Sequence, residues 1–171
     1  AIRLATQQGV TIVVAAGNTG ESPVTFPARA NGVITVGAVD SGDRLASFSS
    51  IGPRVDLVAP GVSILGPALN NTYAVRSGTS FAAPHVTGLA ALLLARDPSW
   101  NAQQIRGALT STAIDLGSPG WDERMGAGRI DAATLGMSLE SALPPTATIH
   151  APGNDTGTLT TIELSLIHIS E

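Results

Sequence analysis

The feature that most constrains the fold is an apolar segment from Ser80 to about Ala95. It begins in a turn of small residues, Gly78-Thr79-Ser80, and places apolar side chains on nearly every side of a helix. Such a helix has no broad polar face to turn toward water, so we expect it to be central and buried. Pro84 lies near its start, where proline disturbs a helix least. The rest of the chain must therefore supply apolar layers that cover this helix.

Three short runs of apolar and largely β-branched residues are predicted to be strands. The first two runs show no alternation of polar and apolar residues, which is typical of strands buried on both faces, and the third is a short strand that ends at Pro60-Gly61. Turn-forming glycine or proline interrupts the chain near the ends of these runs, and buried strands packed on a central helix favour an α/β layered domain. The runs are Val10 to Ala16, Val33 to Val39 and Val55 to Gly61.

Two further helices are expected after the central one. Asn101-Ala102-Gln103-Gln104 has the pattern of a capping box and predicts a helix that continues to about Thr110. The segment from Gly126 to Asp131 is expected to lead into a last short helix.

Composition narrows the class of protein. Of 171 residues, 43% are hydrophobic and 13% charged, which suits one domain with a well-buried core plus a tail. The net charge of −4 with no basic run argues against a nucleic-acid partner. The absence of cysteine excludes disulfides, thiolate metal sites and a cysteine nucleophile. No apolar run reaches membrane-spanning length, and we expect a monomer without a membrane partner.

The composition shifts near Leu143-Pro144-Pro145, which predicts a domain boundary. We expect residues 1–140 to be part of one catalytic domain and residues 141–163 to be a linker with the start of a truncated, β-sandwich-like extension. Residues 164–171 resemble the translation of a sequencing adapter and are expected to be an artefact. Since Ala1 opens directly into an amphipathic segment closed by Gly9, we also expect the chain to start inside a domain.

Ser80 is the candidate nucleophile because it opens a helix. Unpaired N–H groups and the positive end of the helix dipole surround such a serine and favour a reaction that places negative charge nearby. The hydroxyl still needs a base. His85 follows five residues later, rotated by about 140° around the helix, and is expected to be a buried, hydrogen-bonded core histidine. His150 and His168 lie beyond the predicted boundary.

Five motifs, in matching order and spacing, resemble the subtilisin-like serine peptidases (subtilases). The resemblance covers about Ala1 to Leu135 and implies a three-layer α/β fold with a mostly parallel sheet. The motifs are Gly78 to Val86, Val13 to Asn18, Phe26-Pro27-Ala28, Val33 to Asp40, and Leu45 to Ser50 with the following Asp56 to Gly61.

The resemblance also implies roles for individual residues. Ser80 would attack the scissile carbonyl, and the Asn18 amide with the Ser80 backbone N–H would hold the oxyanion. The alternative for Asn18 taken alone is an ordinary turn residue. The substrate-binding residues would be Gly17, Thr25, Phe26 and Thr79, with plain loop packing as the alternative for Thr25 and Phe26.

The chain departs from the family in one respect. Subtilases carry their catalytic aspartate and then their histidine before the serine, and no Asp-Thr-Gly or His-Gly-Thr-His motif precedes Asn18. The resemblance implies that the parent protein is a serine endopeptidase, which hydrolyses peptide bonds through an acyl-enzyme. Because the aspartate and histidine motifs are missing, we expect these 171 residues to be inactive on their own. The family implies secretion and a peptide or protein substrate.

No cofactor is required for this chemistry, but some subtilases hold a weak calcium or sodium ion. The matching ligands here would be carbonyl oxygens of Ala28, Ala30 and Val33 with the Asp56 carboxylate. Arg54 brings a positive charge close to this site and counts against it. The alternative is that Asp56 caps or hydrogen-bonds a loop.

Two rival functions remain at this level. An α/β-hydrolase would need its Gly-x-Ser-x-Gly elbow at Gly78 to Ala82, followed by Asp115 or Asp131 and then His150, but Ala82 replaces the last glycine. A pseudoprotease or binding module would keep the fold and lack the catalytic histidine and aspartate. The coding sequence upstream would discriminate between the peptidase and the binding module.

Overall fold

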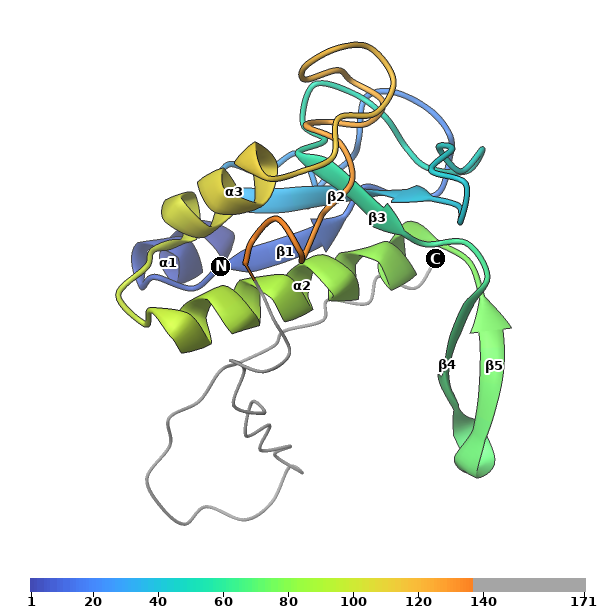
Figure 1. The fold of residues 1–171 in the computed structure, drawn as a ribbon, viewed down its shortest axis with the longest axis horizontal. Coiled ribbons are helices and arrows are strands. Elements are labelled where there is room, and N and C mark those ends of the chain that lie inside the picture. Colours follow the sequence, from blue (N-terminus) through green and yellow to red (C-terminus); the bar gives the residue numbers. More distant parts are fainter. Residues whose placement is uncertain (137–171) are drawn as a thin grey trace.

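The computed structural model describes residues 1–136 as a small α/β unit with a projecting hairpin (Figure 1). No helix in this described part is long and apolar enough to cross a membrane. The elements in chain order are α1 (Ile2–Gln7), β1 (Ile12–Ala15), β2 (Val33–Val39), β3 (Leu57–Pro60), β4 (Ile64–Ala68), the 3-10 turn η1 (Leu69–Asn71), β5 (Thr72–Arg76), α2 (Thr79–Arg96) and α3 (Ala102–Ser111).

The main sheet is parallel and follows the order β1-β2-β3. Val14 pairs with Thr35 across the first ladder, and Val36 pairs with Leu57 across the second. All strands therefore end at the same edge, where the loops after β1 and β3 meet. This arrangement confirms the predicted α/β class with a parallel sheet.

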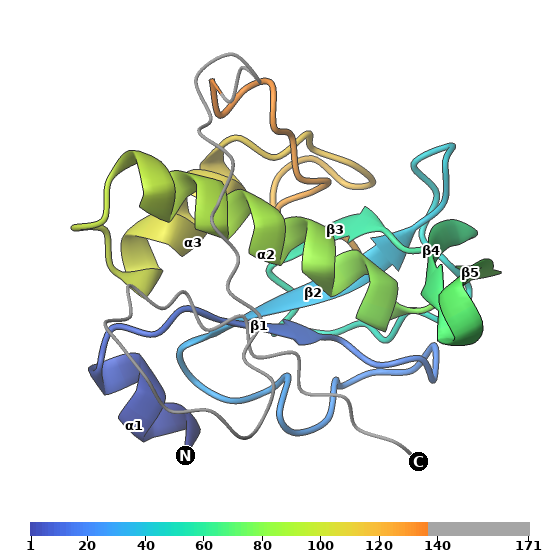
Figure 2. The ribbon, with the colours of Figure 1, turned by 90° about the horizontal axis from the view of Figure 1, so that it is seen from below.

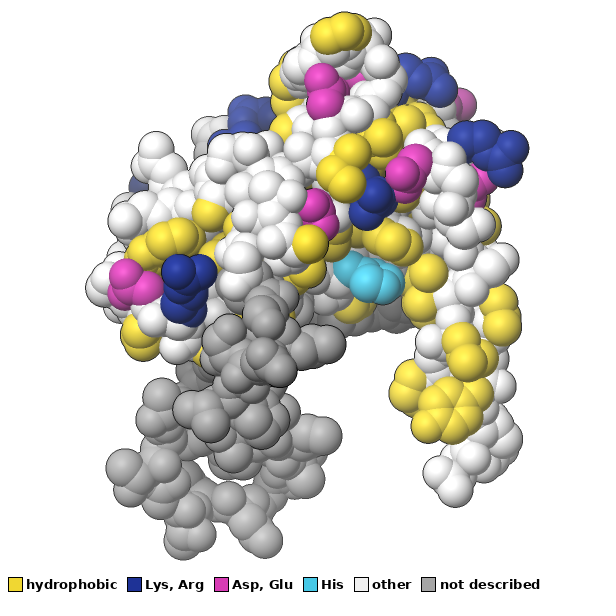
Figure 3. Space-filling model, viewed as in Figure 1, with side chains coloured by type: hydrophobic (Ala, Val, Ile, Leu, Met, Phe, Trp, Pro, Cys, Tyr) yellow, Lys and Arg dark blue, Asp and Glu magenta, His cyan; other side chains and the backbone are white. Residues whose placement is uncertain are grey.

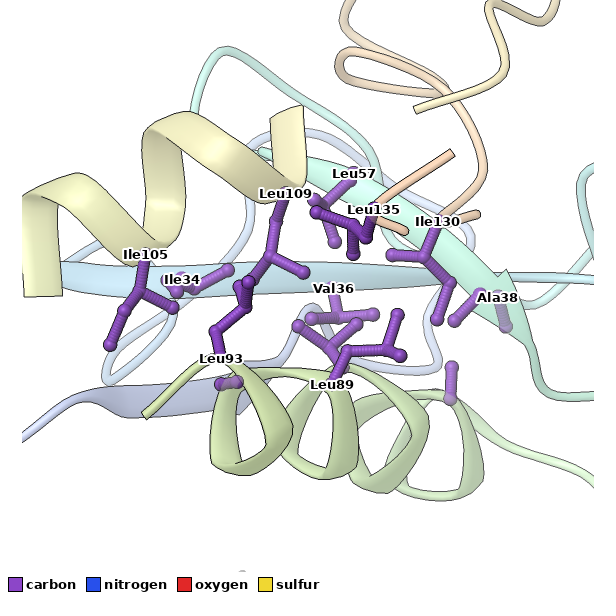
Figure 4. Close-up of a cluster of buried hydrophobic side chains, with 14 of the residues drawn as sticks. Ile34, Val36, Ala38, Leu57, Leu89, Leu93, Ile105, Leu109, Ile130 and Leu135 are labelled. Atoms are coloured by element: carbon purple, nitrogen blue, oxygen red, sulfur yellow. The ribbon is translucent and has the colours of Figure 1, made fainter. Parts of the chain in front are cut away.

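The largest core cluster lies between this sheet and the helices α2 and α3. Side chains alternate along β2, so that Ile34, Val36 and Ala38 point toward the helices. Leu89 and Leu93 of α2 meet them there (Figure 4). In the view of Figure 2, α2 crosses the sheet and α3 lies beside it. Burial of this face holds α2, and with it the Ser80 turn, against the strand ends.

A second cluster covers the other face of the sheet. Val14 of β1 and Val33 of β2 pack with Val24 and Ala28 from the long loop that joins these strands. Ile2 of α1 packs against the same cluster. The loop after β1 is thereby held to the sheet by its own apolar residues.

The hairpin β4–β5 extends away from the body of the unit (Figure 1). Apolar side chains gather on its surface (Figure 3), and each is well over half exposed. They are Leu65, Leu69, Tyr73 and Val75.

The capping box of α3 is confirmed. The Asn101 side chain accepts from the Gln103 and Gln104 N–H groups, each at 3.0 Å, and the Gln104 side chain accepts from the Asn101 N–H at 2.9 Å. Both ends of the reciprocal pair are therefore satisfied, and α3 starts where the sequence predicts.

Two expectations about α2 were wrong. The helix is buried on one face only, because its fully buried positions recur at intervals of three and four residues along that face. His85 is exposed on the other side of the helix and bonds through Nδ1 to the Phe81 carbonyl oxygen at 2.9 Å. The next residue, Val86, is buried in place of His85.

The prediction for β1 was wrong in the same way. Val14 is the one residue of this strand that is buried, so β1 is not buried on both faces.

The predicted helix after Gly126 is absent from the described part of the chain. The Val58 N–H donates to the Gly128 carbonyl at 2.9 Å, and the Ile130 N–H donates to the Val58 carbonyl at 3.1 Å. Residues 126–130 thus extend along the open edge of β3. The predicted helix was to follow Asp131, where the described residues 132–136 form turns. The predicted boundary near 140, the β-type extension at 141–163 and the suspected artefact at 164–171 lie outside the described residues.

Candidate active site

The Ser80 turn is attached to the end of β3 by a close backbone contact. The Gly78 N–H donates to the Gly61 carbonyl oxygen at 2.8 Å. A Cβ on Gly61 would lie 2.7 Å from Ala38 Cβ and 2.9 Å from the Gly78 carbonyl oxygen. Only glycine permits this approach, which fixes the start of α2 over the carboxyl ends of the strands.

Asn18, which follows β1, is joined to the same turn through Thr79. The Thr79 N–H and the Thr79 hydroxyl each donate to Asn18 Oδ1 at 2.9 Å. The hydroxyl also accepts from the Gly17 N–H at 3.2 Å. Since a backbone N–H can only donate, the Asn18 atom that faces it must be the oxygen. The Asn18 NH₂ group is consequently turned away from Thr79 and left to donate elsewhere.

Ser80 lies half-buried in the first turn of α2. No side chain within residues 1–136 forms a hydrogen bond with its hydroxyl. Its own backbone N–H belongs to the first turn, where N–H groups have no partner inside the helix. The Ser80 hydroxyl and the unpaired N–H groups at the positive end of α2 therefore lie in the turn that Thr79 joins to Asn18.

Sequence reasoning missed the part that Ser50 plays in this site. Its N–H donates to the Gly17 carbonyl at 2.9 Å, and its hydroxyl lies 3.0 Å from the Thr19 hydroxyl. These bonds hold the residues on both sides of Asn18. The run of serines before Ile51 was the available signal, but nothing in the sequence indicated which serine faces the loop.

The predicted substrate-binding residues separate into two groups. Gly17 and Thr79 lie together in the hydrogen-bonded cluster just described. Thr25 and Phe26 are exposed in the loop between β1 and β2, with 64% of Phe26 accessible. No hydrogen bond of the described residues joins either one to the Ser80 turn. Their exposure leaves them available to a substrate, while buried Val24 anchors the loop beneath them.

The predicted cation ligands line one pocket of about 210 Å³. Asp56 is buried there, and its Oδ2 accepts from the Thr35 N–H at 2.7 Å. Its Oδ1 accepts from Arg106 Nε at 2.8 Å and also contacts Arg106 Nη2. Burial raises the pKa of Asp56 above its ordinary value, against the lowering effects of the Thr35 N–H and the guanidinium. Ala28, Ala30 and Val33 also line this pocket.

This donor set does not fit a metal cation as it stands. Both Asp56 oxygens are engaged, and the Ala28 carbonyl accepts from the Thr35 hydroxyl at 2.6 Å. Arg54 and Arg106 both line the pocket, so its charged side chains sum to a positive charge. Arg106 was not among the predicted site residues, because fifty positions separate it from Asp56.

Comparisons with known proteins identify the family of this chain. The model of the Subtilase family, Peptidase S8, matches residues 1–128. Subtilisin BL of Lederbergia lenta is 47% identical over 118 residues, which cover 69% of this chain and 44% of that protein. A thermostable alkaline protease of Halalkalibacterium halodurans is 47% identical over 119 residues, which cover 70% of this chain and 33% of that protein.

A solved structure gives the same result for the fold. The prenylagaramide maturation protease PagA superimposes with a TM-score of 0.71 at 31% identity, over 78% of this chain and 52% of that one. The chain therefore spans less than half the length of the two curated relatives and about half of the solved structure. Together with the family match over residues 1–128, these likenesses show that the chain belongs to the subtilase family.

Proposed function

We propose that the protein containing this chain is a serine endopeptidase, with Ser80 as nucleophile and Asn18 in the oxyanion hole. The observation that carries the proposal is the double hydrogen bond from Thr79 to Asn18 Oδ1, which joins Asn18 to the Ser80 turn and leaves its NH₂ free of Thr79. The Ser80 hydroxyl adds to the peptide carbonyl and forms a tetrahedral oxyanion. Donation from the Asn18 NH₂ and the Ser80 N–H stabilises this charge, and departure of the amine leaves an acyl-enzyme for water to hydrolyse.

The reaction needs a general base that the described residues do not provide. His85, the one histidine among residues 1–136, is exposed and bonds to the Phe81 carbonyl on its own helix. Without a base the serine hydroxyl is a weak nucleophile. We therefore include in the proposal that the 171-residue chain alone is inactive, and that residues other than those described supply the histidine and aspartate.

The substrate is proposed to be a peptide or protein. Exposed Thr25 and Phe26 are uncharged and would favour an uncharged side chain before the scissile bond. Secretion, a monomeric state and chemistry without a cofactor are part of the same proposal and rest on the family. The α/β-hydrolase alternative is set aside by the family match, which covers the Ser80 motif.

The decisive experiment uses the complete protein that contains this chain. Ser80→Ala should abolish both peptide hydrolysis and labelling by a fluorophosphonate probe. Asn18→Ala should lower kcat by about 10²–10³ with little change in KM, a magnitude carried over from subtilisin itself. Thr110→Val, on the surface of α3, is the matched control and should leave both parameters unchanged. Full hydrolysis by a folded Ser80→Ala protein would refute the proposal.

The inactivity of the isolated chain is tested separately. The purified 171-residue protein is incubated with a peptide substrate beside its Ser80→Ala variant. Turnover that the variant lacks would contradict this part of the proposal.

The lack of a histidine partner for Ser80 within the described residues also favours a second candidate, a pseudoprotease or binding module. A complete, folded protein that binds peptides but neither hydrolyses them nor reacts with the probe would support that function instead.

A further inference from the structure

The pocket around Asp56 contains more positive than negative charge. It is lined by one carboxylate, that of Asp56, and by the guanidinium groups of Arg54 and Arg106. Arg54 is held at its rim, where Nη2 donates to Asn31 Oδ1 at 2.8 Å. A metal cation entering this pocket would meet net repulsion, whereas such an ion requires anionic or neutral oxygen donors.

Arg106 is held at this place by the packing of α3. Its neighbour Ile105 and, one turn on, Leu109 are fully buried against the sheet and α2. They anchor the helix, so the Arg106 side chain passes over the pocket and meets Asp56 Oδ1 through both Nε and Nη2. Both donors meet a single carboxylate oxygen, while Asp56 Oδ2 is engaged by the Thr35 N–H.

Two of the predicted oxygen ligands of this pocket, the Asp56 carboxylate and the Ala28 carbonyl, already accept hydrogen bonds from protein groups. Thr35 donates through its N–H to Asp56 and through its hydroxyl to the Ala28 carbonyl. A buried carboxylate needs a counter-charge, and Arg106 is the group in contact with it. We infer that the Arg106 guanidinium is the permanent counter-cation of Asp56 and takes the place of a bound calcium or sodium ion at this site.

The inference makes two statements that can be measured. The wild-type chain gains no stability from cations at this pocket. Removal of the guanidinium frees Asp56 and creates a cation site that the wild-type chain lacks. Arg106→Met is the suitable variant, because methionine keeps most of the apolar stem and removes the charge and the donors.

Terbium, a luminescent substitute for calcium, gives a local readout. Trp121 lines the pocket, and its Nε1 donates to the Val55 carbonyl at 3.0 Å, so excitation of this indole should sensitise an ion bound at Asp56. We expect saturable terbium emission from Arg106→Met and none from the wild-type chain. The emission should disappear in the double variants with Asp56→Asn or Trp121→Phe, which locate the ion in this pocket.

Thermal unfolding supplies a second measurement, in chelator, in calcium chloride and in sodium chloride at matched ionic strength. The wild-type midpoint should be the same in all three, and calcium should raise that of Arg106→Met. A folded Arg106→Met chain that binds no terbium would overturn the inference. If this variant does not fold, the wild-type chain decides: stabilisation by calcium that Asp56→Asn removes overturns the inference, and its absence supports it.

Discussion

Replacing Thr79 by valine removes one hydroxyl with almost no change in volume, at a fully buried position. The hydroxyl donates to Asn18 Oδ1 at 2.9 Å and accepts from the Gly17 N–H at 3.2 Å. Asn18 keeps its bond from the Thr79 N–H, so losing the first bond costs about 0.5 kcal/mol. The Gly17 N–H loses its acceptor in a partly buried place, at about 1.5 kcal/mol. We expect Thr79→Val to lower the free energy of unfolding by about 2 kcal/mol.

This loss corresponds to about a 30-fold change in the unfolding equilibrium constant. Urea unfolding followed by circular dichroism should show a midpoint about 1 M lower, for a slope near 2 kcal/mol/M. Thr79→Ser keeps the hydroxyl and should therefore keep most of the stability that Thr79→Val loses. Thr110→Val is the control on α3, where the hydroxyl bonds only to carbonyls of its own helix. If Thr79→Val and Thr110→Val unfold at the same urea concentration, the Thr79 hydroxyl does not join Asn18 to the serine turn.

Three further predictions concern stability. Asn101→Ala removes the cap of α3 and should cost about 1 kcal/mol in urea unfolding, with no cost indicating that the capping box is dispensable. Ile105→Ala removes a fully buried side chain and should lower the free energy of unfolding by about 2–5 kcal/mol. Gln103→Ala, at an exposed position of the same helix, should change it little, and equal effects of the two variants would contradict the packing of α3. Partial burial raises the pKa of Asp122, but hydrogen bonds from backbone N–H groups outweigh this effect and hold the pKa below 3.8. The ionised Asp122 side chain therefore stabilises the fold above pH 3.8, and this contribution is lost as the pH falls through the folded-state pKa. Asp122→Asn should therefore flatten the acid limb of stability against pH, and an unchanged limb would exclude this role.

The sequence predicted the elements whose patterns are local. The strand from Val33 to Val39 has the predicted bounds, because a run that is largely β-branched and has no charged residue suits a strand covered on both faces. The capping box at Asn101 involves residues within one turn and needs no tertiary information. The proximity of Asn18 and Ser80 came from the family resemblance, since no periodicity could relate positions so far apart.

Features that depend on tertiary competition were not predictable from the sequence. The glycine-rich segment from Gly126 to Asp131 was predicted only to lead into a helix, and its pairing with the open edge of β3 was not foreseen. His85 lies within an apolar run, and only the orientation of α2 on the sheet shows that it faces outward. The pairing of Arg106 with Asp56 requires the packing of α3 across the sheet. In each case the deciding partner is remote in sequence.

The proposed oxyanion hole and the activation of its nucleophile are physically separable in this fold. Asn18 and Thr79 are 61 residues apart, yet their hydrogen bonds are supported by the ends of β1 and β3, the start of α2 and the contacts of Ser50 with the Asn18 loop. None of these contacts involves a histidine. Donors arranged in this way stabilise an oxyanion whether or not a base is present, whereas attack by Ser80 requires that base. Residues 1–136 can therefore hold the proposed oxyanion hole in order while no histidine among them accepts a proton from Ser80.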